Sequence, residues 1–134
     1  MNKRVDSRSV SIEIACGDQL DEIRKLGQIV YIKIDVEGHE FFVLLGLRRM
    51  IAKHLPPVFF ECNDAQEFAE LSRIFPGCYS FYRFAGDKNL AQIFAVSGYR
   101  LIPLIADSVP PAPCNILAWP SIELPTHIAN HVLP

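Results

Sequence analysis

The fold predicted for this chain is decided by one stretch, Ile29-Val30-Tyr31-Ile32-Lys33-Ile34-Asp35-Val36-Glu37-Gly38-His39-Glu40. Its side chains alternate between two faces as far as Val36, so the stretch predicts a β-strand over Ile29–Val36. Apolar residues occupy nearly every position, which is typical of a strand covered on both faces in a parallel sheet. Gly38 breaks this pattern, and helical spacing follows. The apolar stripe that predicts one helix over His39–His54 consists of Leu44, Leu47, Ile51 and Leu55.

Strand-like and helical segments alternate through the rest of the chain. Further strands are predicted at Val10–Ala15, Val58–Glu61, Tyr79–Phe84, Tyr99–Ile105 and Asn115–Trp119. Short helices are predicted over Asp18–Leu26 and directly after Asp64, where Asp64 and Glu67 have the spacing of a capping box. This order predicts an α/β fold with a mostly parallel sheet in a single domain over residues 1–134. Residues 121–134 are expected to form an irregular tail, and the fold of residues 86–113 stays open.

Composition excludes several classes of protein. Half of the 134 residues are apolar and the net charge is -2, which is typical of a globular domain and gives no basic footprint for nucleic acid. The first residues are polar, no apolar run approaches the length of a membrane helix, and the four cysteines include no C-x-x-C pair. We therefore expect a cytoplasmic, reduced protein without nucleic-acid or membrane partners.

Acidic residues follow the two best strands. Asp35 and Glu37 end the first, Glu61 ends the second, and His39 and Glu40 begin the helix. Ligands of open α/β sheets bind at the carboxyl ends of strands, where carboxylates can orient a hydroxyl, accept its proton or neutralise a cation. The structural alternative is that these residues cap strand ends and helix starts. A divalent metal site on this turn is a further alternative, and we expect none.

The segment Lys33-Ile34-Asp35-Val36-Glu37-Gly38-His39-Glu40, with Val43-Leu44-Leu45-Gly46 in the helix after it, resembles the K-I-D-V-E-G-x-E signature of the FkbM methyltransferase family. Three other segments resemble parts of the same domain in the correct order. Val10–Ile23 resembles the part before the signature, and Pro57–Glu61 and Asn115–Pro120 resemble parts after it. The resemblance spans about Val10 to Pro120, and Gly86–Pro113 matches less clearly.

The resemblance implies an S-adenosylmethionine-dependent methyltransferase, with O-methylation of a small molecule or sugar as the usual reaction. It implies that Asp35 lies beside the methyl group of the cofactor, and that Glu37 and His39 face the acceptor. Glu40 would order the turn, and Glu61 would line the same pocket.

The family domain begins with a glycine-rich cofactor loop, whereas no two of the seven glycines here are separated by a single residue. The chain therefore resembles the C-terminal part of a Rossmann-like class I methyltransferase sheet without its cofactor-binding half, and such a chain can be inactive alone. The strand at Ile29–Asp35 would then lie open at an edge. We expect it to self-associate, to pair with a separately encoded half, or to be covered by Val10–Ala15. The alternative function is a non-catalytic interaction or scaffold fragment of the same fold.

Overall fold

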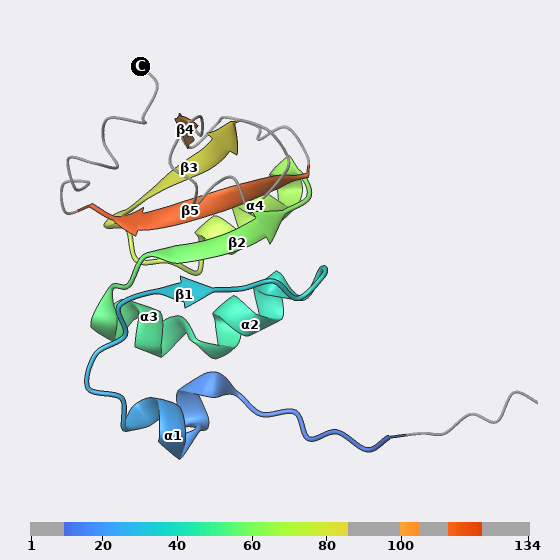
Figure 1. Cartoon of the computed structure of the whole chain (residues 1–134), viewed down its shortest axis with the longest axis vertical. Helices are drawn as coiled ribbons and strands as arrows, with labels where there is room; N and C mark the ends of the chain where they lie inside the picture. Colours follow the sequence, from blue (N-terminus) through green and yellow to red (C-terminus); the bar gives the residue numbers. More distant parts are fainter. Residues whose placement is uncertain (1–9, 86–99, 105–112, 122–134) are drawn as a thin grey trace, which may run out of the picture.

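A computed structural model describes residues 10–85, 100–104 and 113–121 of the chain (Figure 1). In chain order the elements are a 3₁₀ turn η1 (Gly17–Gln19), α1 (Asp21–Arg24), β1 (Ile32–Lys33), α2 (Glu40–Gly46), α3 (Arg48–His54), β2 (Val58–Cys62), α4 (Ala65–Ser72), β3 (Tyr79–Ala85), β4 (Arg100–Leu104) and β5 (Cys114–Pro120). Much of the open segment 86–113 and most of the predicted tail lie outside the described residues.

The strands form a five-stranded mixed sheet in the order β1-β2-β5-β3-β4. Strand β1 pairs parallel to β2, whereas β2–β5, β5–β3 and β3–β4 are antiparallel. The prediction of a mostly parallel sheet is therefore wrong for the described residues, because β5 inserts in reverse between β2 and β3. Strand β5 is antiparallel to both β2 and β3, so β1, β2 and β3 all run in the same direction. The predicted α/β class is confirmed.

The predicted strand Ile29–Val36 is much shorter in the structure, where regular pairing covers only Ile32–Lys33. The amide of Ile34 still donates to the Phe59 carbonyl at 2.8 Å, so the chain follows β2 for one more residue. Among the described residues, strand β1 has a partner strand on one side only. The backbone groups on its other side make no hydrogen bonds to a strand, so they do not stabilise the extended conformation. The predicted strand Val10–Ala15 is also absent, since this segment is exposed and unpaired.

The predicted single helix over His39–His54 is divided into α2 and α3 at Leu47. Glycine at position 46 is a weak helix former, and the second helix has its own cap from a distant residue. The Asp18 carboxylate accepts the amides of Arg49 and Met50 at 2.9 and 3.0 Å, which satisfies two of the free amides at the start of α3. The predicted helix over Asp18–Leu26 is likewise divided, into η1 and α1.

Helices α2, α3 and α4 share one core with alternate residues of β2 and β5. The predicted stripe is confirmed, because Leu44 and Ile51 are fully buried and the other two members pack against the core. The predicted capping box also forms, with Asp64 Oδ1 accepting the Glu67 amide at 2.8 Å. The core lies between these helices and one face of the sheet, and it holds α2 next to the chain that follows β1, because Leu44 and Ile34 both belong to it.

Candidate functional site

The loops that follow β1 and β2 open at the same edge of the sheet. The two strands are parallel neighbours, with Lys33 beside Phe59, so the segment Asp35–His39 leaves the sheet near Glu61, at the carboxyl end of β2. Alternation places Lys33, Asp35, Phe59 and Glu61 on the face opposite the helical core. The structure thus brings the predicted residues of two separate sequence segments to one edge.

The loop after β1 is built on an unusual backbone. Glu37 has φ 49° and Gly38 has φ 89°, so two consecutive residues lie in the left-handed region. Glycine occupies this region freely, whereas a residue with a Cβ atom pays about 1–2 kcal/mol. Strain of this kind persists where the surroundings impose it, and it is concentrated at functional loops. The reversal directs the chain from β1 into α2 within a few residues.

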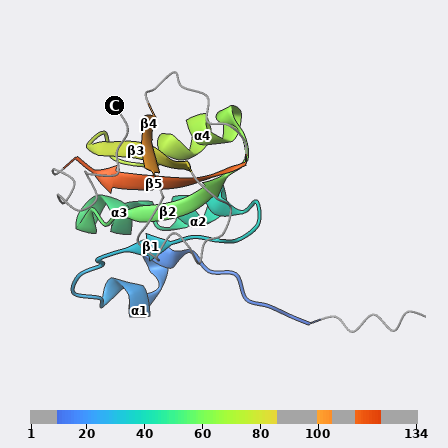
Figure 2. The ribbon, with the colours of Figure 1, turned by 45° about the horizontal axis from the view of Figure 1, so that its top comes forward.

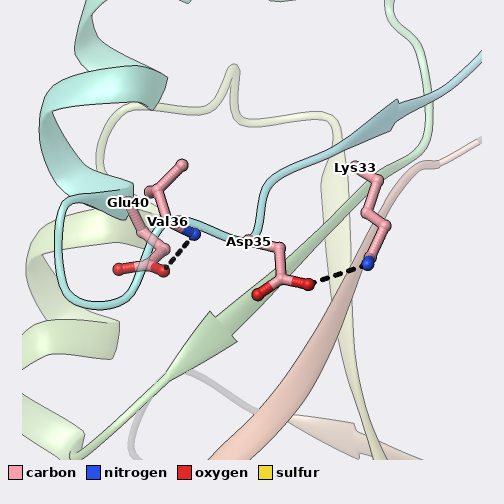
Figure 3. Close-up of polar contacts among 4 residues, drawn as sticks. All are labelled: Lys33, Asp35, Val36 and Glu40. Carbon is pink, nitrogen blue, oxygen red and sulfur yellow. Dashed lines mark hydrogen bonds and ion pairs between the residues drawn. The ribbon is translucent and has the colours of Figure 1, made fainter.

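Glu40 connects this loop to α2 (Figure 3). Its side chain is 1% exposed, and Oε1 accepts the amide of Val36 at 3.3 Å. The second oxygen, Oε2, is buried with no hydrogen-bond partner within the described part of the chain. Glu40 thus closes the loop that carries Asp35 and Glu37, and it leaves one buried oxygen without a donor.

Asp35 is exposed and is held by a basic neighbour. The Lys33 Nζ donates to Asp35 Oδ2 at 2.9 Å, and both side chains are about half exposed (Figure 3). That hydrogen bond, followed by the charge of Asp35, raises the pKa of Lys33. Sequence reasoning missed Lys33 as a partner of this site. Its position two residues before Asp35, on the same strand face, was the available signal.

Glu61 shows that the carboxylates of this edge interact. Burial first, and then the negative charges of Glu37, Glu40 and Asp35, raise the pKa of Glu61. We call these four residues, Asp35, Glu37, Glu40 and Glu61, the acidic edge. A cluster of like charges favours a bound cation, and a carboxyl with a raised pKa is better matched to proton transfer near neutral pH.

His39 has a more peripheral place. It is exposed at the N-cap position of α2, and its side chain makes no capping hydrogen bond. In residues 10–85, 100–104 and 113–121 no three histidine, cysteine, aspartate or glutamate side chains are grouped so that they could hold a metal ion. The residues that the structure brings together are therefore the acidic edge and Lys33, with His39 at the rim.

The four cysteines differ in how deeply they are buried. Cys62 is buried and Cys114 is partly buried, whereas Cys16 and Cys78 are exposed, and all four are free thiols. Burial raises the pKa of Cys62 to about 12. Its thiol is therefore protonated and inert at neutral pH, which excludes it as a nucleophile at this edge.

Comparison with protein families places these observations in context. The model of the methyltransferase FkbM domain matches residues 3–101, which is well over half of the 134-residue chain and includes β1, the acidic edge and β2. The predicted likeness at Asn115–Pro120 lies beyond the matched residues. Searches of curated proteins and of solved structures found no match. No helix within the described ranges is both long and apolar enough to cross a membrane. Through the family match and the signature carried by its acidic edge, the chain belongs to the FkbM methyltransferase domain family.

Proposed function

We propose that the acidic edge is the acceptor side of an S-adenosylmethionine-dependent methyl-transfer site. The observation that supports it best is the convergence of Asp35, Glu37, Glu40 and Glu61, where burial first, and then the charges of the other three residues, raise the pKa of Glu61. The negative charge of this edge fits a cationic ligand. When bound, S-adenosylmethionine supplies an electrophilic methyl group on a positively charged sulfur.

The residues of the chain have distinct parts in this proposal. Asp35 lies beside the methyl group, where its charge stabilises the cofactor's cation. Glu37 and His39 face the acceptor, which we propose to be a hydroxyl of a small molecule or sugar. A carboxylate of the edge would accept the proton that the acceptor hydroxyl loses when its oxygen takes the methyl group. Glu40 holds the loop in position through the Val36 amide, and positioning supplies much of the rate in such a reaction.

The cofactor site needs more than this edge. We propose that β1, β2 and β3, which run in one direction, belong to a partial Rossmann-like sheet. In such sheets a glycine-rich turn approaches the cofactor closely. Seven glycines are present in the chain, and no two are separated by one residue. We therefore propose that the chain alone binds the cofactor weakly, and that full activity requires an additional glycine-rich segment.

The absence of a G-x-G turn from the sequence also favours a second candidate, a non-catalytic scaffold that keeps the fold. The two candidates differ in what Asp35 does. In the methyltransferase its carboxylate is required, whereas in a scaffold it only accepts a bond from Lys33. With four free thiols and a net charge of -2, we further propose a reducing, cytoplasmic location and no nucleic-acid partner.

The test joins this chain to a glycine-rich half from another protein with an FkbM methyltransferase domain. Release of S-adenosylhomocysteine is followed with a panel of sugars and small alcohols. We expect O-methylation that falls by about a hundredfold or more in Asp35→Asn, the usual loss when a group that stabilises charge in the transition state is removed. Asp21→Asn is the matched control, since Asp21 lies on α1 and is exposed. A folded fusion without transfer would favour the scaffold, whereas full activity in Asp35→Asn would refute the role proposed for Asp35.

A further inference from the structure

Strand β1 has an open edge within the described part of the chain. The amides of Ile32 and Ile34 donate to Pro57 and Phe59 of the β2 side, at 3.0 and 2.8 Å. Backbone groups alternate in direction along a strand, so the amides of Tyr31 and Lys33 point away from β2. The sheet order ends at β1, and no described strand receives these groups. An edge of this kind is a template for another strand.

The open edge is also apolar. Val30 is 73% exposed and Tyr31 is 47% exposed, although both lie in the stretch with the strongest strand pattern in the sequence. Exposure of large apolar side chains to water is unfavourable, and a strand that covered them would stabilise the protein by burying their surface.

The chain itself carries a segment that fits this edge. We call residues 10–15 the N-terminal arm. Val10, Ile12 and Ile14 are 81%, 78% and 89% exposed, and they alternate with the polar residues Ser11 and Glu13. The arm runs out from the body in both views (Figures 1 and 2), and it has the period of a half-buried strand without a partner.

We propose that the N-terminal arm of a second copy of this chain adds to the sheet along β1. Five residues of the arm span about 16 Å as a strand, which matches the length of Val30–Ile34. With Glu13 opposite Lys33, Ile12 and Ile14 lie on the face of Ile32 and Ile34, next to the helical core. This match of apolar and charged faces holds for either strand direction. Exchange of arms is reciprocal and gives a closed, two-fold dimer.

The occupant is a second copy because the root of the arm is anchored away from its own edge strand. Cys16 Sγ donates to the Gly46 carbonyl at 3.4 Å, and Asp18 caps α3. Gly17 lies so close to Leu47 that an added Cβ would come within 2.5 Å of its side chain. These contacts direct the arm outward from the end of α2.

The first experiment measures the mass of the full chain by light scattering after gel filtration, across a series of concentrations. We expect a dimer whose dissociation constant rises at least about tenfold in Ile12→Asn, since an isoleucine leaves the interface on both arms. Ser11→Asn is the matched control in the same arm on the polar face, and it should dimerise like the parent. Both positions are exposed in the single chain, so neither change disturbs its folding.

The second experiment distinguishes a second copy from an arm that folds back on its own edge. Glu13→Lys and Lys33→Glu each place like charges opposite one another, which should weaken the dimer about fivefold or more. In a mixture of the two variants, each arm meets an opposite charge on the other chain, so the heterodimer should regain the parent affinity. A chain that stays monomeric, a dimer insensitive to Ile12→Asn, or a mixture no tighter than its components would overturn the proposal.

Discussion

Replacement of Glu40 tests whether its side chain holds the loop that carries the acidic edge. Glu40 is 1% exposed, and its Oε1 accepts the Val36 amide at 3.3 Å. Glu40→Ala removes this acceptor and the buried side chain. Glu40→Gln retains an amide oxygen for the Val36 bond and nearly the same volume, so the two variants separate the hydrogen bond and packing from the charge.

The size of the effect follows from these contacts. Loss of the acceptor costs about 1 kcal/mol, at the low end of the usual range because Val36 is 37% exposed and water can reach its amide. One buried methylene, Cγ, is lost because alanine keeps Cβ, and it contributes about 0.8 kcal/mol, to which the cavity left by the side chain adds. Relief of repulsion within the acidic edge offsets part of this sum. We expect Glu40→Ala to lower the free energy of unfolding by about 1–3 kcal/mol, and Glu40→Gln to stay within about 0.5 kcal/mol of the parent.

The assay is thermal unfolding followed by circular dichroism, supported by urea titration. A loss of about 1–3 kcal/mol corresponds to a fall in Tm of about 3–10 °C for a chain of this size. The reasoning is refuted if Glu40→Ala unfolds at the parent temperature, or if Glu40→Gln is as unstable as Glu40→Ala. The second result would mean that the loop is stabilised by the carboxylate charge and not by the hydrogen bond.

Three further predictions concern other parts of the chain. Asp18→Ala should lower the free energy of unfolding by about 1–2 kcal/mol in urea titration, because α3 loses its cap, whereas Asp21→Ala removes only an exposed ion pair and should change it by less than about 0.5 kcal/mol. Glu61 has a pKa above the usual 4.5 in the folded state, so its ionisation opposes folding. Glu61→Gln should therefore gain stability relative to the parent as the pH rises above about 4.5 and match it at lower pH, and equal stability across this range would contradict the burial and charge effects. At pH 8, Ellman's reagent should react with the exposed Cys16 in the native protein and with Cys62 only after unfolding, since the pKa of Cys62 is about 12; early labelling of Cys62, read by mass spectrometry, would contradict this.

Elements with strong local signals were predictable from the sequence. Strands β2, β3, β4 and β5 lie where apolar runs predicted them, and α4 begins at its predicted capping box. The sequence of each segment indicates its secondary structure locally, and the core of the protein buries its apolar face. The motif residues Asp35 and Glu61 were also correctly placed at adjacent strand ends, because parallel strands open at one edge.

Features that depend on distant partners were not predictable from local pattern. The outer edge of β1 has no partner among the described residues, so regular pairing is short there, and the start of α3 is capped by Asp18, about thirty residues earlier. The antiparallel insertion of β5 changed a mostly parallel sheet into a mixed one. The hydrogen bond between Lys33 and Asp35 was predictable from the strand pattern, because residues two apart share one face of a strand, but Lys33 was assigned no role from the sequence.

The central claim is that the acidic edge contributes to an S-adenosylmethionine site, and a nuclear magnetic resonance titration of the chain with this cofactor tests it most directly, because the method detects weak binding and maps it. We predict saturable amide shifts at residues 35–40 and 61–63 that are reduced in Asp35→Asn. A folded chain without shifts at millimolar cofactor would contradict the claim, as would shifts confined to the hollow between Asp18, Arg49 and Lys53.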